Sequence, residues 1–308
     1  MSQTPPPLPL KNGVAASQVW LPAETWPSLL AFLMARFPQV TEAVWRSRLA
    51  KGEVVDATGN RYGAHSDYPA RQRLFYYREL DDEVRIPFVE QILHMDEHLL
   101  VVDKPHFLPV TPSGRFLHET LLTRLRERLD NPHITPLHRL DRETAGVLLF
   151  SVNPQSRGLY PPLFAERRVH KIYEAIAPTR LDLGFPLTHV SRMVAHPDQF
   201  FRMCETAGEP NSETRISLLE TFGTHSRYRL EPITGRKHQL RVHMASCGMP
   251  ILNDLFYPDA QAVGADDFSR PLQLLAKSIE LTDPLTHEPR FFASAQTLTD
   301  TQSTADGA

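Results

Sequence analysis

The stretch that decides the fold is "ITPLHRLDRETAGVLLFSV", residues 134–152, in which an ionic cluster stands directly before an apolar run. The run Val147–Phe150 is short, apolar and β-branched at its start, a pattern that predicts a buried strand of a sheet. Segment 138–143 places five ionisable side chains at the entrance of that strand. Because burying charges without partners is costly, the cluster indicates a functional site at this edge of the sheet.

The composition is that of a globular chain with room for one large domain and a small one. At 308 residues, with 41% apolar and 22% charged, the chain can bury a full core. No apolar run approaches the roughly 20 residues that a membrane-spanning helix needs, and the first residues lack the basic-then-apolar order of a signal peptide. We therefore expect a cytoplasmic protein without a membrane partner.

Charge and metal-ligand patterns exclude some classes of function. The net charge of −3 argues against coating nucleic acid through bulk charge, although a local basic surface can exist within it. Cys204 and Cys247 have no metal-ligand spacing, so we expect two structural thiols. His238 and His243 are five residues apart, a spacing that does not put two ligands on one helical face. The sequence therefore predicts no metal site.

Composition shifts divide the chain into four parts. Residues 1–18 and 296–308 are Pro-rich or small and polar, which predicts disordered tails. Between these two tails, the acidic stretch "RELDDEVRIP" (78–87) interrupts the periodic pattern of apolar residues. We therefore expect a small module over 19–87 and a larger domain over 88–295.

The small module has the pattern of two helices followed by a hairpin. One helix is expected from an N-cap at Thr25, and a second from Thr41 to Gly52. A hairpin is expected to turn at Gly59–Asn60. The second helix carries three basic residues, which form either an ordinary solvated face or an RNA-contacting one: Arg46, Arg48 and Lys51.

The larger domain mixes strands with a few helices and shows no βαβ rhythm. Two strands are expected around a turn at residues 96–98. The other expected elements are helices near 118–130, 156–166 and 235–248, and strands at 170–177, 214–223 and 226–233. This order predicts an α+β fold, with a mixed, mainly antiparallel sheet and flanking helices.

Three segments of the larger domain carry residues that suit chemistry: "HRLDRETAG" (138–146), "HKIYEA" (170–175) and "TGRKHQLRVH" (234–243). Asp141 lies just before the buried strand, where a carboxylate stays ionised only beside a cation or donors. If the third segment is helical, Arg241 can reach across to it as that cation.

The second segment adds a flat aromatic ring. A strand puts Lys171 and Tyr173 on one face, so Tyr173 can present its ring and phenol to a pocket. One carboxylate, one Arg and one Tyr suit chemistry on a flat heterocycle. Each pair taken singly also fits an ordinary buried ion pair or a core tyrosine, and the three together favour the active site.

The motifs resemble those of RNA pseudouridine synthases of the RluA-type branch. "HRLDRETAG" is similar to that family's HRLDxxTSG signature, and 230–257, "LEPITGRKHQLRVHMASCGMPILNDLFY", to its second long motif. "KIY" at 171–173 matches its KxY element, and 100–114, "LVVDKPHFLPVTPSG", resembles its opening strand and Lys-Pro turn. The similarity covers about 88–295, with the motifs in the family's order.

The resemblance implies roles for individual residues. Asp141 matches the catalytic aspartate, Tyr173 the tyrosine that stacks on the target base, and Arg241 the arginine that pairs with the aspartate. Arg139 matches the residue that fills the gap left by the extruded base, and Leu240 is expected to line the pocket. The other residues expected to contact substrate are His138, Lys171, Arg236 and His238; for His138 we also expect a structural hydrogen bond.

The chain departs from the family pattern at three positions. Ala145 replaces the Ser of TSG, Asn253 stands where the family usually has Gly, and Leu275 replaces the His of the LHA element. Because Asn tolerates a positive φ better than most residues, the second change is mild. None of the three touches Asp141 or its expected partners.

The resemblance implies isomerisation of uridine to pseudouridine in structured RNA without a cofactor. The small module is similar, over "VWRSRLAKGEVV" (44–55), to an RNA-binding domain shared with a ribosomal small-subunit protein. This favours large-subunit ribosomal RNA over transfer RNA as the substrate. A monomer is expected, because recognition of an RNA loop needs no two-fold symmetry.

Two other classes of function remain as alternatives. One is an RNA-binding ribosome-assembly factor that has the fold without turnover; replacement of Asp141, Tyr173 or Arg241 would favour it, and all three are present. The other is a phosphotransferase, since "HRLD" echoes the kinase H-R-D loop. The Asn that follows that loop, the D-F-G element and a Gly-rich phosphate loop are missing from the sequence.

Overall fold

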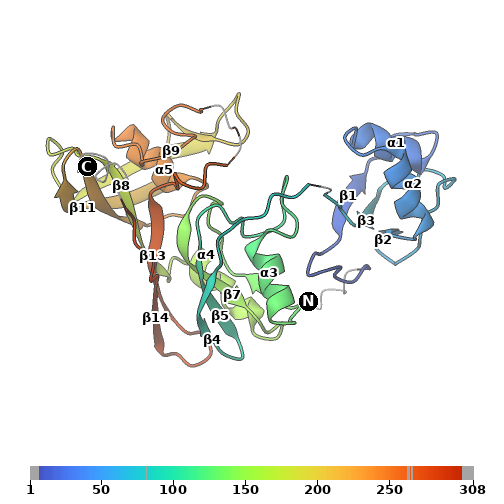
Figure 1. Ribbon diagram of the computed structural model, residues 1–308, viewed down its shortest axis with the longest axis horizontal. Helices are drawn as coiled ribbons and strands as arrows, with labels where there is room; N and C mark the ends of the chain where they lie inside the picture. Colours follow the sequence, from blue (N-terminus) through green and yellow to red (C-terminus); the bar gives the residue numbers. More distant parts are fainter. Residues whose placement is uncertain (1–6, 81, 262–263, 265, 300–308) are drawn as a thin grey trace. The chain divides into compact units, whose positions relative to one another are not determined.

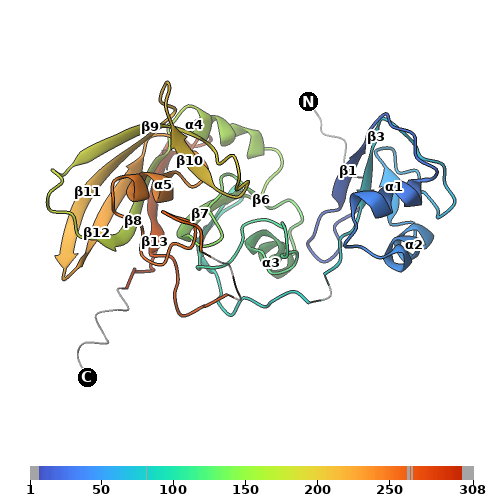
Figure 2. The same ribbon diagram turned by 90° about the horizontal axis from the view of Figure 1, so that it is seen from above.

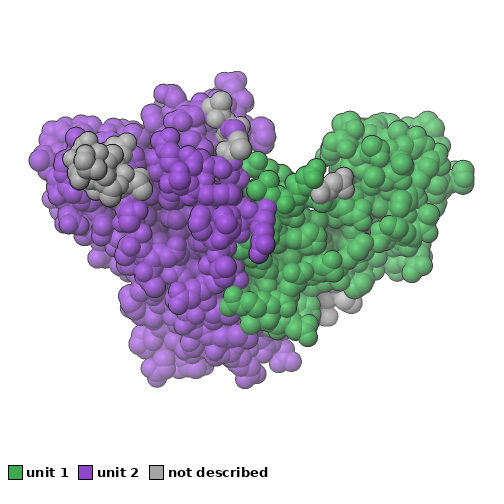
Figure 3. Space-filling view, in the orientation of Figure 1, with its two compact units in different colours: residues 1–84, 111–132 green, residues 85–110, 133–308 purple. Residues whose placement is uncertain are grey.

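The computed structural model describes residues 7–80, 82–261, 264 and 266–299, and the chain divides into two compact units. One unit comprises Met1–Val84 with Thr111–Pro132, and the other comprises Arg85–Val110 with His133–Ala308 (Figure 3). The sequence predicted a single break at residue 87. The break at 84 lies close to it, but the return of 111–132 to the first unit was not predicted.

The first unit is built on a three-stranded antiparallel sheet with the order β1-β3-β2 (Figure 1). Its strands are β1 (Ser17–Leu21), β2 (Val54–Asp56) and β3 (Gln72–Tyr76), and its helices are α1 (Leu29–Arg36), α2 (Glu42–Ala50) and α3 (Leu121–Arg128). Leu21, Leu33, Trp45 and Leu74 pack in one core in which none of them is exposed. This shared apolar core makes α1, α2 and the sheet one folded body.

Hydrogen bonds explain why 111–132 belongs to the first unit. The Glu83 carboxylate accepts hydrogen bonds from the backbone N–H groups of Leu117, His118 and Glu119, at 2.5 to 2.9 Å. Arg126 on α3 donates to the carbonyl of Gly13 at 3.2 Å. These contacts join segments that are far apart in the sequence, so local patterns could not predict them.

The helix caps of this unit follow the sequence in one case and differ in the other. Helix α2 begins after Thr41, as predicted, and the Thr41 hydroxyl accepts from Val44 N. Helix α1 is capped by Ser28 and not by Thr25; the Ser28 hydroxyl accepts from Ala31 N at 3.1 Å. Ser28 is favoured because it directly precedes the first apolar positions of the helix.

The predicted hairpin of this unit is only partly correct. A single bridge joins Val55 to Arg61 across the turn. The main partner of β2 is β3, which the sequence analysis did not identify, and neither did it identify β1. The hairpin signal is local, because it comes from residues three to six positions apart in the sequence. Strands β1 and β3 pair across more than fifty residues, so no local signal indicates them.

Described residues in both of the predicted tails make contacts with folded elements. Strand β1 begins at Ser17, Lys11 bridges to Val14, and the Tyr77 hydroxyl donates to the Pro9 carbonyl at 2.7 Å. At the other end Leu298 is buried, and Thr299 N donates to the Gln273 side chain at 3.1 Å. Small and polar composition did not reveal these contacts, and residues 1–6 and 300–308 lie outside the described part of the chain.

The second unit is an eleven-stranded sheet with few helices (Figure 2). The strand order is β10-β9-β11-β12-β8-β13-β7-β5-β4, with β14 beside β13 and β6 beside β7. The strands are β4 (Gln91–Met95), β5 (Leu99–Lys104), β6 (Thr135–Pro136), β7 (Ala145–Ser151), β8 (His170–Pro178), β9 (Leu187–Ala195), β10 (Met203–Thr206), β11 (Ser212–Phe222), β12 (His225–Pro232), β13 (Leu274–Thr282) and β14 (Pro289–Ala293). The helices are η1 (Arg157–Leu159), α4 (Pro161–Ala165) and α5 (Gln239–Ser246). Among the described strands only β7 and β13 pair in parallel, so the predicted α+β class with a mainly antiparallel sheet is confirmed.

Strand β7 lies inside the sheet, as its apolar run predicted. All of its residues are buried, between β5 and β13. At its start Gly146 has a φ of +112°, and a Cβ there would lie 2.2 Å from the carbonyl oxygen of Ala276. Only glycine permits this close approach, which brings the loop before β7 against β13.

Helix α5 begins later than the sequence predicted. It starts at Gln239, and the preceding His238 is left-handed with a φ of 56°. The Gln239 side chain accepts from Arg236 N at 3.0 Å and from the Thr234 hydroxyl at 2.7 Å, so residues 234–238 form a turn and not helix.

Among the described residues, no helix combines the length and the apolar character needed to cross a bilayer.

Candidate active site

A cavity of about 830 Å³ opens in the second unit between the loop before β7, strand β8 and the start of α5. The sequence placed the candidate site residues in three separate segments, and the structure brings all of them to this cavity. The predicted residues that line it are His138, Arg139, Asp141, Lys171, Tyr173, Arg236, His238, Leu240 and Arg241.

Asp141 faces a buried guanidinium. Its side chain is 26% exposed, and its Oδ2 lies 3.5 Å from Nη1 of Arg241. That Nη1 is buried and makes no hydrogen bond with the described residues; Glu143 Oε2 is 3.9 Å away from it. The Asp141 carboxylate therefore lies beside a buried cation and is open to the cavity, which suits a carboxylate that must act on a substrate.

Arg241 is held in place by a second carboxylate, Asp254. Its Nε and Nη2 donate to the two Asp254 oxygens at 2.7 and 2.6 Å, and both side chains are almost fully buried. Burial alone would lower the pKa of Arg241, but the Asp254 hydrogen bonds and the neighbouring carboxylates raise it. The rings of Phe256 and Tyr257 pack against the guanidinium at 4.9 and 5.4 Å. Sequence reasoning missed this role of Asp254, although the residue lies in the quoted motif 230–257.

Tyr173 and Leu240 form apolar parts of the cavity wall. Tyr173 projects from β8 and is 9% exposed, and Leu240 on the first turn of α5 is 7% exposed. Burial, with the charge of Asp141, raises the pKa of Tyr173 well above its usual value, so its phenol is neutral. Lys171 lines the same cavity from β8, as predicted, and burial lowers its pKa.

His138 supports the loop that carries Asp141. Its Nε2 accepts the backbone N–H of Leu149 at 3.2 Å, and its ring stacks on Phe164 with centroids 5.1 Å apart. Burial, with the charge of Lys171, lowers the pKa of His138 to about 3, so the ring is neutral and its Nε2 lone pair stays available. The predicted structural hydrogen bond of His138 is confirmed.

The turn before α5 supplies His238 and Arg236. His238 Nδ1 pairs with the Tyr257 hydroxyl at 2.9 Å, and its Nε2 lies 3.9 Å from Asp141 Oδ1. Burial lowers its pKa to about 4 despite the nearby carboxylates. Arg236 is exposed and donates from Nε to the Asn211 carbonyl, and Arg139 is exposed on the other side. These two arginines leave positive charge at the mouth of the cavity.

Lys104 supports the loop that carries Asp141. Its side chain is not exposed, and Nζ donates to the carbonyls of Pro105, Leu108 and Arg142 at 2.8 to 3.0 Å. Burial lowers its pKa to about 7 against the opposing effect of Glu143 and Asp141. The sequence analysis noted the Lys-Pro turn but did not connect it to the loop of Asp141.

The three departures from the family motifs lie outside the cavity lining. Ala145 and Leu275 are fully buried and face each other in the parallel pairing of β7 with β13. The two changes from a polar motif residue to an apolar one therefore lie at positions that pair with each other. Both side chains pack with Ile176 and Leu298. Asn253 has a φ of 64°, so the expectation that it tolerates a positive φ is confirmed.

Comparisons with known proteins identify the family of the chain. The family described as RNA pseudouridylate synthase matches residues 98–246. The tRNA pseudouridine synthase C of Vibrio cholerae is 32% identical over 215 residues, which cover 65% of this chain and 88% of the relative. The dual-specificity RNA pseudouridine synthase RluA of Salmonella typhimurium is 33% identical over 198 residues, 63% of this chain and 87% of the relative.

Solved structures show the same fold. Human RNA pseudouridylate synthase domain containing 1 aligns with a TM-score of 0.56 at 24% identity, over 71% of this chain and 93% of that one. Human RNA pseudouridylate synthase domain containing 4 aligns with a TM-score of 0.51 at 26% identity, over 68% and 88% of the two chains. The chain belongs to the RluA-type RNA pseudouridine synthases, which are isomerases that convert uridine to pseudouridine.

Proposed function

We propose that the chain isomerises a uridine of structured RNA in this cavity, with Asp141 as the group that acts on the sugar. The observation that carries the proposal is the position of Asp141. Its carboxylate is open to the cavity and lies 3.5 Å from a buried guanidinium nitrogen that makes no hydrogen bond within the described part of the chain. A carboxylate placed beside a buried cation and open to the cavity suits attack on C1′ or abstraction of the 2′ proton.

The reaction is an isomerisation whose atoms balance without a cofactor. The bond from C1′ to N1 breaks, the freed uracil turns within the cavity, and a bond from C1′ to C5 forms. The C5 proton leaves, and N1 gains a proton. A cavity of about 830 Å³ can hold a nucleotide and allow the base to turn.

Tyr173 holds the base in this proposal and takes part in removing the C5 proton. Its pKa is raised by burial and by the charge of Asp141. Once Asp141 bonds to C1′, or takes up the 2′ proton, that charge is lost on either route. The pKa of Tyr173 then falls, and the phenol becomes a better participant in proton transfer at the step where C5 must lose its proton.

Arg139 is assigned to base flipping. A uridine inside folded RNA must leave its stack before it can enter the cavity, and this costs a few kcal/mol. Arg139 is exposed, lines the cavity and directly precedes Leu140 and Asp141 in the loop. It can occupy the space that the base vacates, and its charge contacts phosphate.

Large-subunit ribosomal RNA is the proposed substrate, with transfer RNA as the alternative. The first unit supports ribosomal RNA through its similarity over 44–55 to a small RNA-binding domain. Arg46 on α2 and Lys51 at its C-cap are exposed, but Arg48 is only 4% exposed and packs over Trp45. Arg48 therefore packs against the core of the first unit. The basic face available for RNA is smaller than the sequence suggested. The names of the relatives include a dual-specificity enzyme and a transfer RNA enzyme, so both RNA classes need testing.

The direct test is release of tritium from uridine labelled at C5. We expect the purified full chain to release tritium from ribosomal RNA transcribed without modification, and to release less from transfer RNA. Asp141→Asn should reduce release by at least about 10³-fold, because the group that acts on the sugar is lost. RNA affinity and Tm should stay near those of the wild type, because Asp141 is part-exposed and contributes no strong hydrogen bond.

The matched control is Asp198→Asn, which removes an exposed carboxylate in the β9–β10 connection and should leave turnover unchanged. Turnover by Asp141→Asn within about tenfold of the wild type would remove Asp141 from its proposed role.

We further propose that the chain acts in the cytoplasm as a monomer. A dimer detected by light scattering would contradict the proposed monomeric state.

A further inference from the structure

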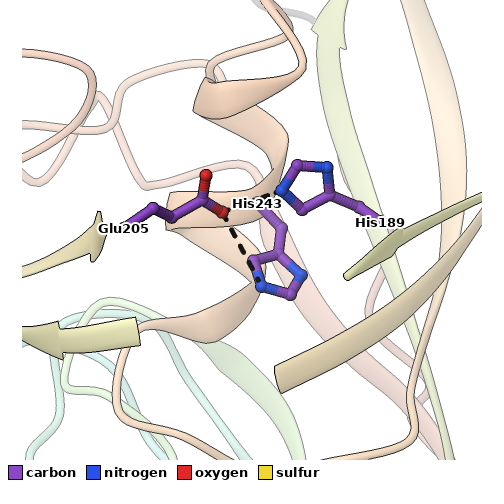
Figure 4. Close-up of side chains that lie close together, drawn as sticks. All are labelled: His189, Glu205 and His243. Carbon is purple, nitrogen blue, oxygen red and sulfur yellow. Dashed lines mark hydrogen bonds and ion pairs between the residues drawn. The ribbon is translucent and has the colours of Figure 1, made fainter. Parts of the chain in front are cut away.

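A second polar cluster lies away from the RNA cavity, where β9, β10 and α5 meet. It is formed by His189, Glu205 and His243, and Figure 4 shows the Glu205 carboxylate reaching toward both imidazole rings. We propose that these three side chains bind one divalent transition-metal ion, with Zn²⁺ as the best match. The proposal does not depend on the RNA reaction.

The donor atoms converge on a common point. Glu205 Oε1 lies 2.8 Å from Nε2 of His189 and 3.9 Å from Nε2 of His243. One ligand atom from each residue lies within 4.8 Å of the other two. Tetrahedral ligands about 2.0 to 2.1 Å from a zinc ion are roughly 3.3 Å apart, so side-chain shifts of about 1 Å would complete the site.

Both imidazoles are anchored through their other nitrogen. His243 Nδ1 pairs with the Thr214 hydroxyl at 2.9 Å, and His189 Nδ1 lies 3.4 Å from Cys247 Sγ. Metal-binding histidines are typically fixed in this way, because the outer partner sets the tautomer and aims the free nitrogen at the ion. Here the outer partners aim both Nε2 atoms at the same carboxylate.

Two serine hydroxyls lie beside His243 in the cluster. Ser191 and Ser212 hydroxyls lie 3.2 and 3.0 Å from His243 Nε2. A hydroxyl can rotate away from an entering cation, so these contacts do not block the site. An open depression of about 480 Å³, lined in part by Ser191 and Glu205, provides access and room for a water as fourth ligand.

The ligand set selects the class of metal. Two imidazoles and one carboxylate suit Zn²⁺ and its neighbours Co²⁺ and Ni²⁺ better than Mg²⁺ or Ca²⁺, which prefer oxygen ligands alone. A bound ion would join β9 and β10 to α5, the helix that carries Leu240 and Arg241. We assign it a structural role in holding that helix.

The test is metal binding to the full chain after treatment with a chelator. Titration with Zn²⁺ against a chromophoric chelator should show one site per chain, and Co²⁺ should give the d–d absorption of a low-symmetry site. At free Zn²⁺ about 100-fold above the dissociation constant, the folding equilibrium should shift about 100-fold. This shift appears as a higher Tm.

The decisive variant is Glu205→Gln, which keeps a hydrogen-bond acceptor for His189 but loses the charged ligand. It should fold, bind Zn²⁺ at least about 100-fold more weakly and show no rise in Tm with Zn²⁺. His189→Gln should behave alike, and His65→Gln, which removes an exposed imidazole from the first unit, should bind as the wild type does. Absence of Zn²⁺ binding to the wild type, or unchanged binding by Glu205→Gln, would overturn the proposal.

Discussion

The buried guanidinium of Arg241 serves two carboxylates at once. Asp254 takes two of its nitrogens in a bidentate pair at 2.6 and 2.7 Å, which leaves Nη1 directed at Asp141. Such a pair fixes the plane of the guanidinium and hence the position of the remaining nitrogen. Asp254 therefore positions the guanidinium that faces Asp141.

Arg241→Ala should lower both stability and turnover. It leaves the fully buried Asp254 carboxylate without a cation, at a cost of about 3–5 kcal/mol in free energy of unfolding. Thermal unfolding and tritium release would measure the two effects. In the double variant Arg241→Met with Asp254→Asn the buried charge is absent, so Tm should partly recover while turnover does not. A Tm unchanged by Arg241→Ala would contradict the buried pair.

Tyr173 can be tested by separating its ring from its phenol. Tyr173→Phe keeps the stacking surface, so KM for RNA should change by less than about threefold, while kcat should fall by about 10²-fold through loss of the phenol. Tyr173→Ala should also raise KM, because base–aromatic stacking contributes about 1–3 kcal/mol. Equal kcat values for Tyr173→Phe and the wild type would limit Tyr173 to stacking.

At this scale the motifs predicted residues that the structure brings together at one cavity. Each of the predicted residues lies in a short motif, so it can be recognised from its neighbours in the sequence. The sequence did not identify Asp254 or Lys104 as supports. Asp254 follows Arg241 by thirteen residues through a turn, and Lys104 binds a carbonyl 38 residues away. Only the folded chain brings such partners together.

The pairing of β7 with β13 positions the loop that carries Asp141. It is parallel and short, with Leu275 opposite Ala145 and Ala276 opposite Gly146. Because Gly146 lies directly against the Ala276 backbone, the loop that carries Asp141 is held at the edge of β13.

Gly146→Ala should therefore destabilise the second unit. Its Cβ would lie 2.2 Å from a backbone oxygen, and the residue would need a φ of +112°. Steric overlap and the unfavourable φ together should cost about 2–4 kcal/mol. Gly184→Ala is the matched control, since nothing lies within 4 Å of the added atom. Equal Tm values for the two variants would contradict this account.

Elements with a strong local signal were predicted, and those defined by distant pairing were not. The turn at 96–98, strand β8 and helices α2 and α3 follow caps or periodicity that the sequence displays. Strands β9 and β10 lack that signal: β9 is mostly half-exposed or exposed, and its identity depends on pairing with β10 and β11. The start of α5 was misplaced because the Gln239 side chain closes a turn there.

At the scale of the whole molecule, buried neutral histidines make stability depend on pH. Burial lowers the pKa of His138 to about 3 and those of His106 and His238 to about 4, below the usual value of 6.5. Above pH 6.5 these histidines are neutral in both states and stability is fully present. As the pH falls from 6.5 toward the folded pKa values, the unfolded chain binds protons first and stability is lost.

We therefore expect Tm to fall between pH 7 and pH 5, with up to about 1 kcal/mol per pH unit from each buried histidine. His138→Gln keeps an acceptor for the Leu149 N–H but cannot bind a proton, so its Tm should depend less on pH over this range. The same pH dependence in His138→Gln and the wild type would show that His138 does not contribute.

The central claim, that Asp141 drives uridine isomerisation in a specific RNA, is tested most directly in cells. Pseudouridine would be mapped by carbodiimide labelling and primer extension on ribosomal and transfer RNA from cells with and without this gene. The account predicts that at least one pseudouridine disappears and is restored by the wild-type gene but not by Asp141→Asn. Restoration by Asp141→Asn, or an unchanged map in cells without the gene, would contradict it.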